Sequence, residues 1–396
     1  MTDHILDGLT LGPLIIVREK MLALQAAGRK VYRLEAGDTS FDTPPHIQKA
    51  ITDALESGRT HYPPITGLPQ LREAMLAKVR AQNHLPIRDA DHVVVTVGGM
   101  HGLYLTFCSM LNPDDEVILP DPMWGETAEL IRRPGGVPVP VTLRPEHDFG
   151  YAAADIEAAI TPRTKAIYIN SPHNPVGVVL SEEQLRQIAD VAIRHNLFVV
   201  SDEAYETVAF DGLKHISIGS LPGMADRTIT VFSFSKAYAM TGLRLGYMVS
   251  NDDLLQDRVR KLMRLTTGGV ASAIQWGGVA AITGSQDTTH HMMMELERRR
   301  NILFEGLQTI PVWQMFKPQG AFYIWAKISD TWDGYQGKKD GWAMTNYLID
   351  TTAIGTSPGI AFGESGDKYI RFAFTGAPEM LTESIEIMQD LFSGAG

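Results

Sequence analysis

Short β-branched runs alternate with helical patterns between about residue 70 and about residue 250, and this alternation constrains the fold more than any other feature. The runs are 92–97, 116–119, 166–169, 197–200, 228–231 and 245–249. Between two of them, segment 181–192 has apolar residues at helical spacing, and Ser181 followed by Gln184 is typical of a capping box. Strands that alternate with helices are joined by crossovers, so the pattern predicts an α/β fold with a mostly parallel sheet. Runs that are apolar on both faces indicate that helices cover both sides of the sheet.

The pattern changes after about residue 250. A long helix-compatible stretch covers 252–307, and its charge cluster, from Glu295 to Arg300, predicts a solvated helix face. Two strand-like pieces follow at 321–325 and 369–374, with one helix between them and one after them. We expect a smaller α+β domain here. The predicted organisation is residues 1–45 as an N-terminal arm and part of the small domain, 46–290 as the large domain and 291–396 as the small domain.

Composition excludes several classes of function. Lysine and arginine number 35 against 46 acidic residues, which gives a net charge of −11. General binding to nucleic acid or to an anionic membrane needs a positive field, so we expect neither kind of partner. The single cysteine, Cys108, lies in an apolar run and cannot form an internal disulfide or a thiolate cluster, and we predict no metal site. The first ten residues lack a signal-peptide pattern, and no apolar run approaches the roughly 20 residues of a membrane helix, so we expect a cytoplasmic protein.

Segment 233–247 is the richest in chemistry. It follows a predicted strand and places Lys236, two serines, glycines and Arg244 in a turn before the next strand. A lysine in a dry pocket loses part of its preference for the ammonium form and becomes a usable amine for Schiff-base chemistry. Ser233 and Arg244 suit a phosphate, since one offers a hydroxyl and the other a planar guanidinium. The alternative is a surface loop with a solvated lysine and arginine.

Two further segments follow strands. Segment 170–177 contains Asn174 between prolines, which build a rigid turn; the alternative is an ordinary crossover turn. Asp202 stands at the carboxyl end of the next strand, where ligands bind in open α/β sheets. The alternative role of Asp202 is to cap a helix.

Taken together, these segments resemble the fold-type I pyridoxal-phosphate enzymes, and specifically the class I aminotransferases related to aspartate aminotransferase. The resemblance extends over nearly the whole chain, because further family segments stand in register at 31–44, 62–72, 120–124, 318–323 and 370–372. It implies a seven-stranded, mostly parallel sheet sandwiched by helices, with pyridoxal 5′-phosphate as the cofactor. It also implies amino acid and 2-oxo acid substrates, and a homodimer with shared active sites.

The family roles can be assigned residue by residue. By resemblance, Lys236 would form the internal aldimine and move the proton between the substrate Cα and the cofactor. Asp202 would keep the pyridine nitrogen protonated, and Asn174 and Tyr205 would hydrogen-bond the phenolic oxygen. The other cofactor-binding residues implied by the resemblance are Gly99, Met100 and His101 at the phosphate, Ser233 and Arg244 beside them, Trp124 on the ring face, and Tyr62 from the partner subunit. The implied substrate-binding residues are Arg371 at the α-carboxylate, with Gly37, Trp124 and Asn174.

Met100 departs from one aspartate-specific branch, in which a lysine at this position binds the distal carboxylate. We therefore expect hydrophobic, aromatic or broad-range amino donors, with aspartate aminotransferase as the alternative. A cation elsewhere, for example Arg264 or Lys261 of the other subunit, could still serve a distal carboxylate. The role of His173 stays open between a bystander and a cofactor contact.

Three other readings compete. A nicotinamide dehydrogenase would use the 98–102 turn, and Asp121 about 20 residues on favours it, but the Gly-x-Gly-x-x-Gly pattern is missing and Lys236 stays unexplained. A ligand-sensing regulator of the same fold would carry a DNA-binding domain in front, for which we expect no room. A lyase or cyclase would keep the same lysine and arginine, because reaction choice depends on bond orientation in the pocket.

Overall fold

The computed structural model describes residues 12–393 and divides them into two compact units. The small unit contains the chain up to Asp38, Leu296–Pro318 and the chain from Phe322 on; the large unit contains Thr39–Glu295 and Gln319–Ala321. Residues 1–11 and 394–396 lie outside the described part, and with them the first ten residues and the start of the expected N-terminal arm. The domain boundaries expected at 45 and 290 stay a prediction.

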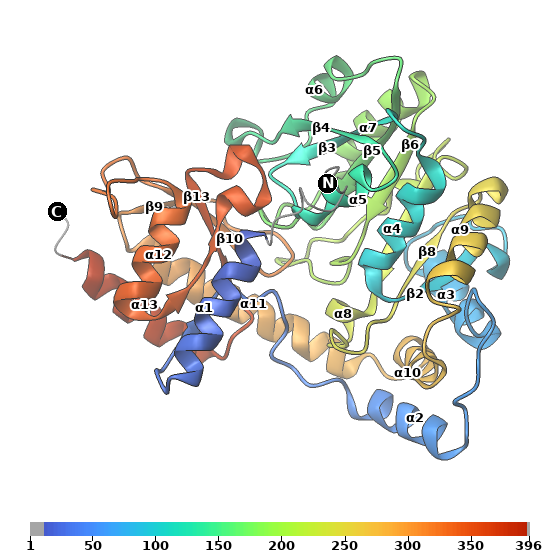
Figure 1. The fold of residues 1–396 in the computed structure, drawn as a ribbon, viewed down its shortest axis with the longest axis horizontal. Helices are drawn as coiled ribbons and strands as arrows, with labels where there is room; N and C mark the ends of the chain where they lie inside the picture. Colours follow the sequence, from blue (N-terminus) through green and yellow to red (C-terminus); the bar gives the residue numbers. More distant parts are fainter. Residues whose placement is uncertain (1–11, 394–396) are drawn as a thin grey trace, which may run out of the picture. The chain divides into compact units, whose positions relative to one another are not determined.

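A seven-stranded sheet forms the centre of the large unit within the described residues, in the order β2-β8-β7-β6-β5-β3-β4 (Figure 1). The strand β8 runs antiparallel to both of its neighbours, and the other neighbouring pairs are parallel. The strands are β2 (Val93–Thr96), β3 (Glu116–Asp121), β4 (Val137–Thr142), β5 (Thr164–Asn170), β6 (Phe198–Asp202), β7 (Thr228–Ser233) and β8 (Gly246–Val249).

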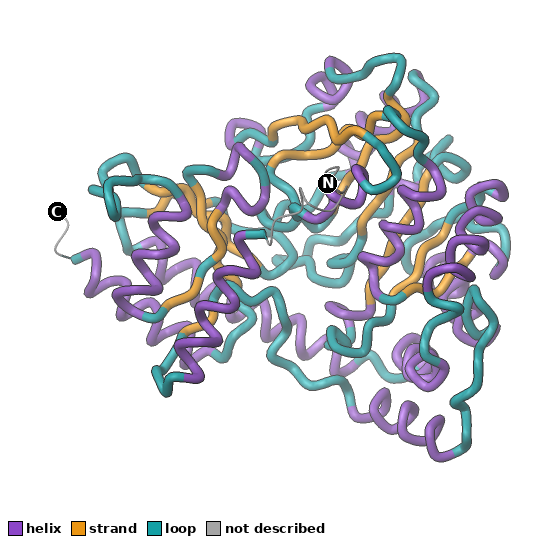
Figure 2. Tube along the Cα trace, in the orientation of Figure 1, coloured by secondary structure: helices purple, strands orange, loops and turns teal. Residues whose placement is uncertain are grey.

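Helices cover both faces of this sheet (Figure 2). Alternate residues of a strand point to opposite faces, so Val94 and Met248 pack with α4 and α9, while Val95 and Tyr247 pack with α3. The expected α/β fold with a mostly parallel, doubly covered sheet is therefore confirmed. The helices of the large unit are α2 (Pro45–Glu56), α3 (Pro69–Ala81), α4 (Gly98–Met110), α5 (Glu126–Arg132), α6 (Ala153–Ala158), α7 (Glu182–Arg194), α8 (Phe234–Ala237), α9 (Asp253–Thr266) and α10 (Ser272–Thr283), and α11 (Asp287–Gln308) runs on into the small unit.

One strand of the large sheet was not expected from the sequence. β4 contains Pro138 and Pro140, and proline cannot donate to a strand ladder, so the run reads poorly as a strand. It is tolerated because β4 lies at the edge of the sheet and pairs with β3 alone among the described strands. The expected helical stretch 252–307 contains three helices, because Gly268, Gly269 and Gly284 separate them.

The small unit contains an antiparallel sheet, in the order β12-β13-β10-β9, and a parallel pair, β1-β11. The strands are β1 (Tyr32–Arg33), β9 (Trp313–Met315), β10 (Tyr323–Ile328), β11 (Ile354–Gly355), β12 (Ser357–Pro358) and β13 (Tyr369–Ala373). Its helices are α1 (Pro13–Ala26), α12 (Gly341–Thr352) and α13 (Pro378–Phe392). None of the helices in the described part of the chain is long and apolar enough to cross a membrane.

The charge cluster on α11 corrects one expectation. Arg300 is fully buried and donates to the carbonyl of Pro318 at 3.1 Å, and the buried Arg299 donates to the carbonyl of Thr375 at 2.5 Å. The prediction of a solvated face is wrong for these two arginines, because their guanidinium groups satisfy backbone carbonyls inside the small unit.

Candidate active site

Polar side chains follow three neighbouring parallel strands of the large unit at the ends where those strands finish. Asn170 ends β5 and stands opposite Asp202, which ends β6. Ser233 ends β7, the next strand in the sheet. In an open α/β sheet this edge is where ligands bind.

Asp202 is buried, with 8% of its surface exposed, and is held by two donors. The hydroxyl of Tyr168 donates to Oδ2 at 3.0 Å, and the amide of Ala204 donates to Oδ1 at 3.1 Å. Burial nevertheless raises the pKa of Asp202 to about 6, since neither donor brings a positive charge. The carboxylate is therefore poised for a cationic partner.

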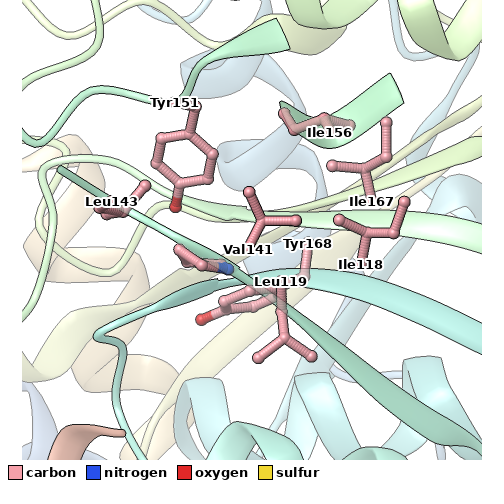
Figure 3. Close-up of a pocket in the computed structure, with 9 residues that line it drawn as sticks. Ile118, Leu119, Val141, Leu143, Tyr151, Ile156, Ile167 and Tyr168 are labelled. Atoms are coloured by element: carbon pink, nitrogen blue, oxygen red, sulfur yellow. The ribbon is translucent and has the colours of Figure 1, made fainter. Parts of the chain in front are cut away.

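The surroundings of Tyr168 explain this burial. Figure 3 shows a small apolar cavity between β3, β4 and β5, bordered by Tyr151 and Tyr168. The Tyr151 hydroxyl accepts from the amide of Asn170 at 3.0 Å, and the Asn170 side chain donates to the carbonyl of Asp202 at 3.0 Å. Sequence reasoning missed Tyr168 and Asn170 as supports of Asp202. The available signal was a tyrosine inside an apolar strand, since a buried hydroxyl usually needs a partner.

Asn174 and His173 lie in the turn after β5. Asn170 Oδ1 accepts from the amide of Asn174 at 2.8 Å, so the turn that presents Asn174 is tied to the strand that supports Asp202. His173 is fully buried, and its ring packs edge-on to Tyr151 with centroids 6.1 Å apart. Burial lowers the pKa of His173 to about 3, so its imidazole is neutral at physiological pH.

Lys236 lies on α8, directly after β7, and is half-buried. Its Nζ atom lies 6.0 Å from the ring centroid of Tyr205, which follows β6. The lysine, Tyr205 and Asp202 are thus carried by the ends of two adjacent strands. This placement fits the chemical reading of segment 233–247 better than a solvated surface loop.

The Gly98-Gly99 turn forms a narrow cradle at the start of α4. Gly98 has a φ of +74°, and a Cβ atom there would lie 2.7 Å from Nη2 of Arg244. A Cβ atom on Gly99 would lie 3.5 Å from Cβ of Ser233. No side chain among the described residues caps this helix, whose first amides are available to an anion. The structure therefore brings Arg244, Ser233 and the helix terminus together, as an anionic ligand requires.

The remaining predicted cofactor residues of the large unit differ in exposure. Met100 lies in the first turn of α4 with 42% of its surface exposed, and Nδ1 of its neighbour His101 accepts from the amide of Val97 at 3.2 Å. Trp124 is half-buried in the turn after β3. Tyr62 is 96% exposed, so within a single chain it is not fixed against the cradle.

Arg371 is the centre of a second arrangement, within the small unit. Its guanidinium carbon lies 3.9 Å from the ring centroid of Tyr323 and 4.5 Å from that of Phe362. Nη2 donates to Ser357 Oγ and to the carbonyl of Glu35, each at 3.2 Å. A Cβ atom on Gly37 would lie 2.5 Å from the Tyr323 hydroxyl, so Gly37 and Arg371 share Tyr323 as a neighbour. Arg371 is thereby a buried cation with a fixed orientation.

Known proteins are similar to this chain over most of its length. Residues 29–388 match the profile of the family described as Aminotransferase class I and II. The aromatic-amino-acid aminotransferase 2 of Thermococcus litoralis is 36% identical over 372 residues, which cover 93% of this chain and 94% of that protein. The aspartate aminotransferase of Musicola paradisiaca is 33% identical over 370 residues, covering 93% and 91% of the two chains.

Solved structures agree with these relatives. The aspartate aminotransferase of Thermus thermophilus with maleate superposes with a TM-score of 0.90 at 32% identity, covering 96% of this chain and 97% of that one. The aromatic aminotransferase of Pyrococcus horikoshii gives a TM-score of 0.88 at 33% identity, covering 94% and 99%.

The residues present fit pyridoxal phosphate. The cradle at Gly98 leaves room for a phosphate beside Arg244 where a Cβ atom would fill it. The buried Asp202 offers a carboxylate to a pyridinium nitrogen, and Lys236 offers an amine from the next strand end. Profile, relatives and geometry agree that this chain belongs to the class I and II aminotransferases and is a transaminase that depends on pyridoxal 5′-phosphate.

Proposed function

We propose that the amino donors of this transaminase are hydrophobic, aromatic or broad in range. Met100 carries this proposal: it stands in the first turn of α4, two residues beyond the Gly98 cradle, and presents a thioether there. A thioether gives an adaptable apolar wall. A distal carboxylate buried against it without a cation would cost several kcal/mol.

Aspartate use is the second candidate. Relatives named for aspartate and for aromatic amino acids match this chain at similar identity, so their names do not decide between the two donor classes. Of the two cations named above as examples, Lys261 is paired with Asp257 at 2.5 Å, whereas Arg264 is exposed near the end of α9. Aspartate use would need such a cation from a second subunit.

We infer the chemical roles from the family to which the chain belongs, and the placement of Asp202 and Lys236 supports them. Pyridoxal phosphate, when bound, supplies an electron-withdrawing ring that accepts the electron pair of the substrate Cα–H bond. Lys236 holds the cofactor and moves a proton to and from the substrate Cα through Nζ. Asp202 holds the proton on the pyridine nitrogen, and Asn174 and Tyr205 donate to the phenolic oxygen.

The phosphate and the substrate are held by other groups. The backbone of Gly99, Met100 and His101 binds the phosphate at the start of α4, together with Ser233 and Arg244. Trp124 covers the ring face. Arg371 binds the substrate α-carboxylate by a bidentate pair, and Gly37, Trp124 and Asn174 are the other substrate-binding residues. The amino acid leaves as a 2-oxo acid, and a second 2-oxo acid collects the amino group.

We also propose a homodimer in which Tyr62 reaches the partner subunit's phosphate. Tyr62 is 96% exposed and Leu265 is 82% exposed. The two lie in adjoining segments, because a Cβ atom on Gly269 would lie 3.3 Å from Cγ of Pro63. A second subunit that covers these segments would remove the apolar surface of both side chains from water, which favours association.

A panel of kcat/KM values tests the donor proposal. Phenylalanine, leucine, methionine and aspartate are compared as donors, with 2-oxoglutarate and with pyruvate as acceptors. We expect the apolar donors to equal or exceed aspartate. An aspartate preference of about a hundredfold, roughly 2.7 kcal/mol of transition-state binding, would show that a cation compensates for Met100.

Half-reactions separate transamination from elimination or cyclisation. An amino acid alone should convert the bound cofactor to its amine form, and a 2-oxo acid should restore the aldehyde form. Release of ammonia with the cofactor unchanged would instead assign the chain to a lyase.

A further inference from the structure

A buried polar cluster adjoins the segment that carries Asp202 and Tyr205. We call it the Glu203 cluster; its members are Lys78, Asn83, Ser201, Glu203, Glu206, His215 and Ser217. Glu203 is 1% exposed and accepts from Ser201 Oγ at 2.9 Å, from His215 Nε2 at 2.8 Å and from Ser217 Oγ at 2.5 Å. Three donors thus fix one carboxylate immediately after Asp202 in the chain.

Glu206 anchors the same segment three residues further on. It accepts from Lys78 Nζ on α3 and from Asn83 Nδ2, the latter at 2.7 Å. Asn83 Nδ2 also lies 3.0 Å from Ser217 Oγ, and so joins the two carboxylates into one network. Residues 202–206 therefore belong to two groups. Asp202 and Tyr205 belong to the candidate site, while Glu203 and Glu206 belong to the Glu203 cluster.

Glu203 carries a negative charge inside the cluster. Its partner His215 has a buried Nδ1 atom with no hydrogen-bond partner among the described residues. Burial raises the pKa of Glu203, but His215, Ser217 and Ser201 together lower it below its usual value, so Glu203 is ionised at neutral pH.

We propose that Glu203 is a positioning residue for the reaction: its buried carboxylate fixes the turn that carries Asp202 and Tyr205, and its charge favours a cation beside Asp202. The inference rests on the roles proposed above for Asp202 and Tyr205. Glu203 does not touch the cofactor or substrate in this account; it acts through Asp202. Burial is the main reason why the pKa of Asp202 is raised, and the charge of Glu203, the next residue in the chain, raises it further, so the field of Glu203 reaches Asp202.

Glu203→Gln tests the proposal, since it keeps the shape of the side chain and removes the charge. Holoenzyme loaded with ¹⁵N-labelled pyridoxal phosphate should show a shift of the ring nitrogen resonance toward the unprotonated form. The dissociation constant of the cofactor should rise about tenfold, equal to about one pKa unit of lost stabilisation, while the donor KM changes little.

Two controls separate this role from a merely structural one. Glu116→Gln removes another buried carboxylate, held by Thr161 and Arg163 at the opposite end of β3 from the site, and should lower stability without moving the nitrogen resonance. His215→Gln keeps a donor to Glu203 and should retain the wild-type resonance. If Glu203→Gln does not fold, Ser217→Ala weakens the hold on Glu203 and should weaken cofactor binding about threefold.

The Asp202→Asn variant separates the role proposed for Glu203 from the role proposed for Asp202. There, adding Glu203→Gln should change cofactor affinity no further, because the effect passes through Asp202. A fully additive effect, or a Glu203→Gln resonance equal to that of Glu116→Gln, would overturn the inference. If Asp202→Asn itself leaves affinity and half-reaction rate unchanged, the proposed role of Asp202 fails instead.

Discussion

At the scale of single residues, the buried carboxylate of Asp202 lowers the stability of the cofactor-free protein. Its folded pKa of about 6 lies above the ordinary value of 3.8, so the folded state holds its proton more tightly than the unfolded state. Stability is therefore lost as pH rises from about 4 to about 6, by roughly 3 kcal/mol. Asp202→Asn removes this titration.

The cofactor-free Asp202→Asn variant should thus gain stability relative to the cofactor-free wild type as pH rises through that window. Thermal unfolding of both proteins at pH 4 and pH 7.5 gives the difference in stability between variant and wild type at each pH. The change in this difference between the two pH values is the test, because any pH-independent effect of the lost hydrogen bonds cancels in it. A difference that is independent of pH would contradict the burial argument. With the cofactor bound the order should reverse, because the carboxylate then has a cation.

Arg371 supplies a second prediction at this scale. Its guanidinium lies between the rings of Tyr323 and Phe362, and a cation–π contact contributes about 1 kcal/mol. Phe362→Leu should therefore raise the KM for amino donors about fivefold with little change in kcat, since the contact orients Arg371 equally in the ground and transition states. Phe362→Tyr, which keeps the ring, should stay near wild type. A fall in kcat at constant KM would place Phe362 in a different role.

At the scale of elements, the start of α4 depends on a glycine with positive φ. Gly98→Ala puts a Cβ atom 2.7 Å from Arg244 Nη2 at a φ of +74°, whereas Gly58→Ala creates the same backbone strain, at +72°, in open space. Both variants should lose about 1 kcal/mol of stability. Only Gly98→Ala should weaken pyridoxal phosphate binding, by tenfold or more in a cofactor titration. Equal binding by both variants would show that the cradle does not hold the phosphate.

The elements also show what the sequence could predict. The β-branched runs predicted six of the seven strands in the large sheet, because buried parallel strands are apolar on both faces. β4 escaped because Pro138 and Pro140 are tolerated only at an edge, and edge position is a tertiary property. Arg300 escaped because its partner, the carbonyl of Pro318, lies on another segment.

The residues of the candidate site also divide into those that the sequence could predict and those that it could not. Lys236 and Asp202 could be predicted because Asp202 ends a strand and Lys236 follows one closely, at the edge where the fold gathers its ligands. Their supports could not, since these meet only after folding. Lys78 and Glu206, for example, are 128 residues apart in sequence.

At the scale of the whole molecule, the proposed dimer predicts that specific activity depends on protein concentration, because a dissociated monomer lacks the shared site. Leu265→Glu puts a charge at an exposed position near the Tyr62 segment and should shift sedimentation toward monomer, with weaker cofactor retention. Leu254→Glu, on the same helix and 59% exposed, is the matched control and should leave the dimer intact. Tyr62→Phe should weaken cofactor retention without dissociating the dimer. A wild-type monomer of full activity would refute the shared site.

The proposed chemistry depends above all on Lys236, which holds the cofactor. Borohydride treatment of the loaded enzyme fixes a cofactor that is joined to a lysine through a carbon–nitrogen double bond, and peptide mass mapping then locates it. We expect the added mass to lie on Lys236 and to be absent from Lys236→Ala. Attachment to any other lysine, or no attachment in wild-type enzyme that retains the cofactor, would contradict it.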